Sequence, residues 1–160
     1  MSDERRVTSD RERMMPAISM WQPWATFVCL GWKTIETRTH ERLKSLKGKR
    51  IVIHATQKVD ESAFMNMYYP KSLSMLDAIN LTGFVNMNRG RLLCTATVAA
   101  ARWAPNVQFD EHEEWNKKAM CDVAGKFCLF LEDIEPLRER VPFKGRQGIF
   151  YVPETGTAGS

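Results

Sequence analysis

The stretch that decides how this chain folds begins Ser19-Met20-Trp21-Gln22-Pro23-Trp24 and ends Gly31-Trp32-Lys33-Thr34-Ile35-Glu36-Thr37-Arg38. It holds three tryptophans, an amide, a lysine, a glutamate and an arginine. Segments that only fill a core rarely carry so many charges, because charged side chains are seldom fully buried unless they are paired. We therefore expect this stretch to line a functional cleft.

The first half of this stretch predicts a strand and then a short helix. The apolar residues 17–21 favour a strand, which ends at Gln22 and Pro23. Proline suits the first turn of a helix, where its missing N–H costs nothing. Helical spacing of apolar residues follows over 24–30. Gly31 is expected to end the helix, because glycine accepts a left-handed turn without strain.

The second half predicts a strand over 33–39, since its threonines and isoleucine favour extended structure. Side chains alternate along a strand, which puts Glu36 and Arg38 on one face. They could share a ligand there, or they could form a surface ion pair on a solvated face. Lys33, at the start of the strand, could point to either face.

The rest of the chain alternates apolar runs with helical and turn-like segments. The expected strands cover 50–55, 91–103, 126–134 and 149–152, the expected helices cover 60–69, 72–79 and 110–120, and a turn-rich link covers 83–90. Six strands with few helices predict an α+β domain built on a twisted, partly closed antiparallel sheet.

The length of 160 residues predicts one folded domain over 16–153. Residues 1–15 and 154–160 are expected to be flexible tails, because they are charged or small and polar. No apolar run approaches the roughly 20 residues that a membrane span needs. We expect a cytoplasmic protein that does not contact a membrane.

The net charge of +4 is unevenly distributed. Residues 1–58 contain 12 Lys and Arg against 6 Asp and Glu, a net of +6, and residues 59–160 carry the remaining −2. A basic half suits a polyanion such as nucleic acid. A solvated basic surface with no partner is the alternative.

Cysteine and histidine spacing predicts neither a metal site nor a cofactor. The four cysteines are Cys29, Cys94, Cys121 and Cys128, and the three histidines are His40, His54 and His112. No two cysteines form a CxxC pair, so buried, reduced thiols are expected, with a catalytic cysteine as the alternative. His54, at the end of a buried strand, is expected to be a core residue.

Several motifs together resemble the ASCH domain, a member of the PUA-like superfamily. They lie at Trp21 to Trp24, Gly31 to Arg38, Ile53 to Ala55 and Lys144 to Phe150, and the segments 90–96 and 131–134 are also similar. The resemblance spans about residues 17–153. It implies a small β-barrel with flanking helices and a cleft that faces the first helix.

The resemblance also implies a function in RNA metabolism or nucleic-acid binding. One bacterial branch hydrolyses N(4)-acetylcytidine, and another member is a ribonuclease. Lys33 matches the catalytic lysine of the hydrolase branch, and Glu36 stands where that branch has a threonine. For such a reaction we expect Glu36 to be the base, Lys33 to stabilise the oxyanion or act as nucleophile, and Arg38 to keep the carboxylate ionised.

The ligand is then expected to be RNA, single-stranded nucleic acid or a modified nucleoside. Trp21 or Trp24 would stack on a base, and Gln22 and Gln147 would read its edge. The phosphate would contact Lys144, Arg146 and also Arg38. Three alternatives remain open: a non-enzymatic RNA or DNA reader, a ribonuclease, and a protein-interaction module that leaves Met65, Met67 and Met75 uncovered.

Overall fold

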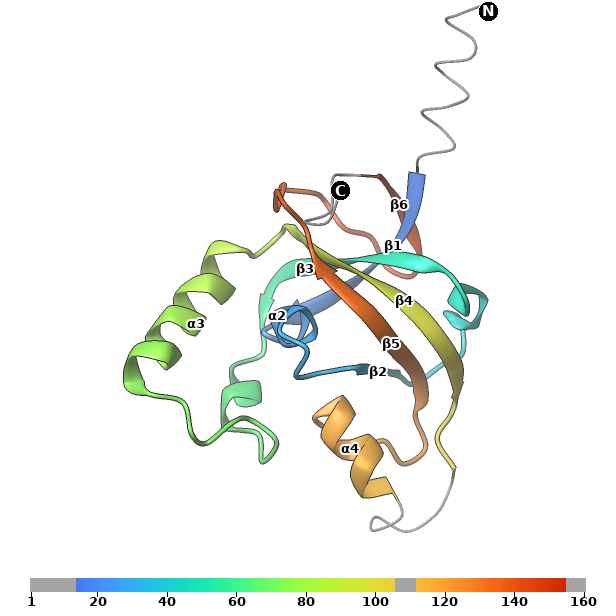
Figure 1. The fold of residues 1–160 in the computed structure, drawn as a ribbon. Coiled ribbons are helices and arrows are strands. Elements are labelled where there is room, and N and C mark those ends of the chain that lie inside the picture. Colours follow the sequence, from blue (N-terminus) through green and yellow to red (C-terminus); the bar gives the residue numbers. More distant parts are fainter. Residues whose placement is uncertain (1–13, 106–111, 155–160) are drawn as a thin grey trace, which may run out of the picture.

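A curved six-stranded sheet forms the centre of the computed structural model, which describes residues 14–105 and 112–154 (Figure 1). The strands are β1 (Met14–Gln22), β2 (Ile35–Arg38), β3 (Arg50–Val59), β4 (Leu92–Trp103), β5 (Phe127–Pro136) and β6 (Phe150–Pro153). Their order across the sheet is β2-β5-β4-β3-β1-β6. The α+β class is confirmed, and β4, expected to be central, lies inside the sheet.

Two features of the sheet differ from the expectation. The neighbours β1 and β3 run parallel, whereas the other four pairs are antiparallel. Parallel neighbours need a crossover, and here α2, β2 and a short 3₁₀ turn form the connection between them. The sheet also ends at β2 and β6, which do not pair with each other in the described residues, so barrel closure is not confirmed.

Helix α2 (Trp24–Cys29) packs inside the curve of the sheet (Figure 1). Ala25 and Val28 are fully buried in the main core beside residues of β1, β3, β4 and β5. The helix starts directly after Pro23, and Gly31 follows its end with a φ of +78°. This start and stop confirm the predicted boundaries to within one residue.

The region between β3 and β4 differs from the prediction. A short 3₁₀ helix over Glu61–Met65 replaces the helix expected over 60–69. Helix α3 covers Met75–Met87, so it begins after the expected start at 72 and extends into the segment 83–90 that was expected to be a link. Its start is capped by Ser74, whose hydroxyl accepts the N–H of Asp77. Gly83 would by itself weaken the helix. The next turn is stabilised because Val85 is buried and its carbonyl oxygen accepts from the Gln22 side chain.

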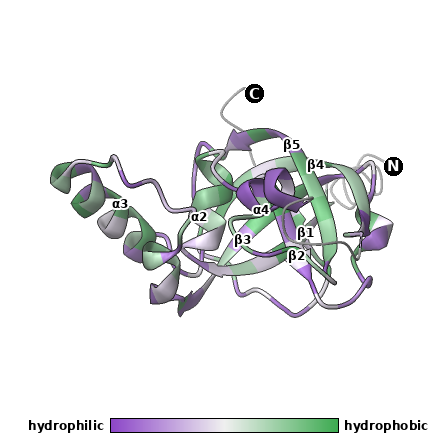
Figure 2. Cartoon of the chain, turned by 90° about the horizontal axis from the view of Figure 1, so that it is seen from below, coloured by the Kyte–Doolittle hydropathy of each residue, from purple (hydrophilic) through white to green (hydrophobic). Residues whose placement is uncertain are grey.

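Most of α3 projects from the side of the sheet, and apolar stretches run along it (Figure 2). Large apolar side chains are exposed on this helix and on the segment before it: Met65, Met67, Met75, Leu76, Ile79 and Met87. Met65 is 88% exposed and Met75 is 81% exposed. The uncovered methionines expected of a protein-interaction module are therefore present.

Helix α4 (Glu113–Ala119) lies between β4 and β5 in the sequence and packs against β2. It carries acidic residues in its first turn and lysines in its last, which complements the helix dipole. None of the helices in the described ranges has the length and apolar character needed to cross a bilayer. Both predicted tails lie mainly outside those ranges and stay predictions, although β1 already begins at Met14.

Candidate functional site

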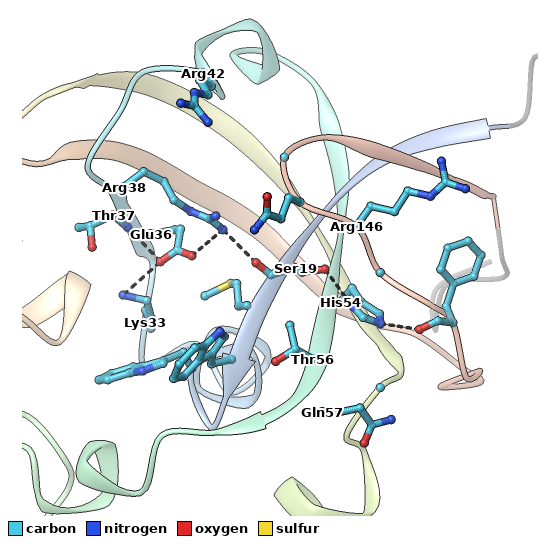
Figure 3. A pocket seen from close by; sticks show the side chains of 18 of the residues that line it. Ser19, Lys33, Glu36, Thr37, Arg38, Arg42, His54, Thr56, Gln57 and Arg146 are labelled. Carbon is cyan, nitrogen blue, oxygen red and sulfur yellow. Dashed lines mark hydrogen bonds and ion pairs between the residues drawn. The ribbon is translucent and has the colours of Figure 1, made fainter.

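A cavity of about 1220 Å³ opens between β1, β2, the end of β3 and the segment 142–148. Eight of the nine predicted site residues line it, and Gln22 is the exception. Residues from opposite ends of the sequence therefore meet at one place. Figure 3 shows that the polar side chains on its floor point toward one another.

One wall of the cavity is a carboxylate held between two cations (Figure 3). Glu36 Oε2 lies 3.1 Å from Arg38 Nη2, and Glu36 Oε1 lies 3.8 Å from Lys33 Nζ. Oε1 also accepts the backbone N–H of Thr37 at 3.0 Å. We call Lys33, Glu36 and Arg38 the acidic–basic wall.

Lys33 is 3% exposed, and its ammonium has three kinds of partner. It donates to the carbonyl oxygen of Ala119 at 2.5 Å, it pairs with Glu36, and it lies 5.3 Å from the centroid of the Trp24 ring. A carbonyl oxygen, a carboxylate and an indole face all stabilise a positive charge. These surroundings fit an electrostatic role for Lys33 better than a nucleophilic one.

Arg38 connects this wall to β1. Its Nη2 also donates to the backbone carbonyl of Ser19 at 3.0 Å, and its buried Nε has no partner among the described residues. Ser19 Oγ in turn lies 2.9 Å from Nδ1 of His54. A continuous line of polar contacts thus crosses the floor of the cavity (Figure 3).

His54 is buried, as expected of a core residue, but it also lines the cavity. Its Nε2 lies 2.7 Å from the carbonyl oxygen of Phe143. A carbonyl can only accept, so Nε2 carries the proton and the neutral ring accepts the Ser19 hydroxyl proton at Nδ1. Burial lowers the pKa of His54 below its ordinary value, which favours this neutral form.

The two predicted stacking residues differ in exposure. Trp21 is 50% exposed, and Lys58 Nζ lies 5.0 Å from its ring centroid. Trp24 is half-buried, packs edge-to-face on Phe27 and donates from Nε1 to Asp60. Both tryptophans line the cavity, and Trp21 offers the freer face.

The opposite side of the cavity is an exposed, irregular segment that carries Lys144, Arg146 and Gln147. We call residues 142–148 the basic segment. Neither cation in it forms an ion pair with another described residue, and the same holds for Arg42 and Lys126, which also line the cavity. Four cationic side chains therefore face the cavity without a carboxylate partner in residues 14–105 and 112–154.

Gln22 is fully buried outside the cavity, and its amide is used within the protein. Its Oε1 accepts from the backbone N–H and the hydroxyl of Thr26, and its Nε2 donates to the carbonyl of Val85. The side chain of Gln22 therefore joins β1, α2 and α3 and does not line the cavity, although its neighbours Trp21 and Trp24 do.

Several lining residues were not predicted from the sequence to belong to the site, among them Ser19, His40, Arg42, Cys121 and Lys126. Cys121 reaches β2 from a loop more than 80 residues away, with its Sγ 3.7 Å from Thr37 Oγ1, and Lys126 belongs to the same loop. No local spacing signals such a contact. The cluster of charges in 33–42 was the available signal for Arg42.

The cysteines are free thiols, and two of them, Cys29 and Cys121, are half-buried rather than buried. Burial raises the pKa of Cys128 to about 11, and a hydrogen bond with Cys29 raises the pKa of Cys94. Neither raised thiol suits nucleophilic catalysis at neutral pH, because the thiolate is the nucleophile.

Comparison with known proteins supports the fold through structure. Neither family models nor curated proteins match the sequence. The structure is similar to the crystal structure of ASCH from Zymomonas mobilis, with a TM-score of 0.51 and 17% identity over 87% of each chain. This chain has the ASCH fold.

A mutant of the same protein, ZmASCH, matches with a TM-score of 0.50 and 16% identity, covering 87% of this chain and 88% of that one. The ASCH fold that the sequence motifs implied is thus confirmed by the three-dimensional structure. At this identity the likeness concerns the fold, and the chemistry of the cavity has to be argued from its own residues.

Proposed function

We propose that this ASCH-fold chain binds RNA, single-stranded nucleic acid or a modified nucleoside in the cavity, and that it hydrolyses an acyl group from the exocyclic amine of a base. The observation that carries the proposal is the convergence of three kinds of group in one cavity. These are indole faces, a carboxylate between two cations, and four cations that form no ion pair within the described part of the chain.

Binding would use the exposed aromatic, amide and cationic side chains that line the cavity. Stacking on an aromatic ring is worth about 1–3 kcal/mol per base and tolerates any base. Trp21, with its exposed ring, is placed for that role, while Gln147 offers an amide donor and acceptor to a base edge. Lys144, Arg146 and Arg42 supply positive charge for a phosphate group.

Hydrolysis would use the acidic–basic wall. Glu36 removes a proton from water as the water oxygen attacks the acyl carbon, and the C–N bond then breaks as the amine takes up that proton. Both oxygens of Glu36 already accept hydrogen bonds, yet a carboxylate has about four acceptor sites, which leaves capacity for a water. Lys33 and Arg38 stabilise the negative charge that develops on the acyl oxygen.

The test is incubation with N(4)-acetylcytidine, free and within an oligonucleotide, with release of acetate and cytidine followed by chromatography. We expect turnover by the wild type and its loss in Glu36→Gln and Lys33→Met. Lys44→Met, at an exposed lysine outside the cavity, is the control for removal of one charge. Absence of turnover in the folded wild type would exclude the hydrolase.

Two alternatives use the same cavity. A reader without catalysis predicts salt-sensitive binding and no product. A ribonuclease predicts cleavage of unmodified RNA in the same assay, and the structure brings His40 and His54 to one cavity, which the sequence spacing did not indicate. Because both ring nitrogens of His54 already have protein partners, we favour the hydrolase.

A second candidate function rests on α3. Several apolar side chains of α3 are exposed, and Asp77 is the one charged residue in this helix. Exposed apolar surface of this kind marks protein contacts. Sedimentation velocity over a range of concentrations tests whether this face joins two copies. Association that Leu76→Lys with Ile79→Lys abolishes would support it, and a concentration-independent monomer would exclude that partner.

A further inference from the structure

The basic segment has little backbone support of its own. Phe143 N–H donates to the carbonyl of Gly90, and Val141 O accepts the N–H of Leu92. From residue 144 to residue 149, no backbone hydrogen bond to another described residue is formed. Lys144 and Arg146, which are proposed to contact phosphate, therefore lie on a segment that is not fixed by the backbone hydrogen bonds of a helix or a strand.

A close contact replaces that support. A Cβ on Gly145 would lie 2.5 Å from Ser19 Oγ and 2.6 Å from both Cε1 and Nδ1 of His54. No real side chain fits at such distances, so the segment lies directly on the Ser19–His54 pair. Gly145 needs no left-handed φ, and the requirement at this position is one of space.

The pair beneath Gly145 is itself firmly held. Ser19 and His54 are register partners on the parallel strands β1 and β3. His54 is 3% exposed, lies edge-to-face against Phe150, and bonds to the carbonyl of Phe143 within the segment. Phe143 in turn stacks on Phe150 with ring centroids 6.0 Å apart.

Ser19 belongs to both sides of the cavity. Its carbonyl accepts from Arg38 in the acidic–basic wall, and its hydroxyl bonds to the histidine on which the basic segment lies. A displacement at this residue would therefore change the distance between the wall and the segment.

From this geometry we infer that Ser19, His54 and Gly145 form a clasp that positions Lys144 and Arg146 against the acidic–basic wall, so that the clasp sets affinity for a phosphate-bearing ligand. These are positioning residues, since they act through the segment. The inference rests on the proposed function, because it takes the cavity to be the ligand site.

The first arm of the test does not depend on a ligand. Trypsin cuts after lysine and arginine, and cleavage after Lys144 and Arg146 reports local opening of the segment. We expect Gly145→Ala to accelerate these two cleavages several-fold. The matched control is Gly83→Ala, because a Cβ there meets nothing within 4 Å and the residue has no left-handed φ.

The second arm measures binding of a fluorescein-labelled single-stranded RNA at several salt concentrations. We expect Gly145→Ala to weaken binding about tenfold and to lower the salt slope by about two, as loss of two phosphate contacts would. His54→Gln, which keeps an N–H donor for Phe143, should bind more tightly than His54→Ala. A merely destabilising change would lower the melting temperature without changing the salt slope.

The outcomes separate the two proposals. Equal cleavage of Gly145→Ala and Gly83→Ala, together with wild-type affinity and salt slope, would overturn the clasp. If the wild type binds no RNA, the proposed ligand class fails, and the trypsin arm still decides whether the clasp holds the segment. Should Gly145→Ala not fold, Ser19→Ala and His54→Ala carry both arms, with the same expected directions.

Discussion

The two sides of the cavity are built in opposite ways. In the acidic–basic wall, Lys33 and Glu36 are buried and every charge has a partner in the wall or in the adjacent backbone. In the basic segment, Lys144 and Arg146 are exposed and have no described ion-pair partner. The difference suggests a division of work, in which the wall is preorganised for chemistry and the exposed cationic side chains of the segment are available to a charged ligand.

The same difference predicts how each side responds to mutation. Removing one partner of a buried ion pair destabilises the fold, because the remaining charge is left buried without a counter-charge. Exposed cations without partners contribute little to stability and can contribute much to binding.

Glu36→Gln should lower the free energy of unfolding by on the order of 3 kcal/mol, because it leaves two cations of the wall without a counter-charge. Urea denaturation followed by tryptophan fluorescence measures it. The control is Glu41→Gln, at an exposed carboxylate that pairs with Lys44, and it should leave stability unchanged. Equal effects of the two variants would show that the wall is not a coupled buried cluster.

Gln22→Ala should lower the free energy of unfolding by about 2 kcal/mol, because the Thr26 N–H and the Val85 carbonyl lose their buried hydrogen-bond partner. RNA affinity, measured where the variant is fully folded, should stay at the wild-type value. A selective loss of affinity with intact stability would return Gln22 to the ligand site.

These two glutamine and glutamate positions show what the sequence can and cannot predict. The dense run from Trp21 to Arg38 identified the wall, because charges so close together along one strand must lie near each other. The same density suggested a ligand role for Gln22, whose amide is instead used by Thr26 and by Val85, 63 residues away. Local sequence cannot show which distant backbone group will use a buried amide.

The fold shows the same limit. Gly31 could be predicted to end α2, because its φ requirement is local. The extension of α3 past Gly83 could not be predicted, since it depends on the burial of Val85 in the folded structure. The parallel pairing of β1 with β3 likewise depends on the whole crossover, and with it the contact between Ser19 and His54.

Lys144→Ala combined with Arg146→Ala should change the melting temperature little and weaken binding of single-stranded RNA about tenfold or more, with a salt slope lower by about two. Fluorescence anisotropy at several salt concentrations measures both quantities. Lys47→Ala with Lys49→Ala removes the same charge from exposed positions outside the cavity and is the control. An equal loss in the control would indicate a diffuse electrostatic attraction and no defined segment.

The smallest predicted effect concerns pH. Burial lowers the pKa of His54 in the folded state, so the unfolded chain takes up a proton at higher pH than the folded one. Stability should therefore be full above about pH 6.5, the ordinary histidine value, and should fall as the pH drops from there toward the lowered folded pKa. In thermal melts, His54→Gln should reduce the fall in stability over this pH range. An unchanged dependence of stability on pH would show that other titrating groups cause the fall.

Whether a ligand occupies the cavity between the wall and the basic segment can be tested directly with the five tryptophans. Trp21 and Trp24 line the cavity, and Trp32, Trp103 and Trp115 do not. In a ¹H–¹⁵N spectrum each indole N–H gives its own signal during titration with single-stranded RNA or N(4)-acetylcytidine. The account predicts saturable shifts of the Trp21 and Trp24 signals with little change at Trp103 and Trp115. Shifts confined to Trp103 and Trp115, or none at all with either ligand, would contradict it.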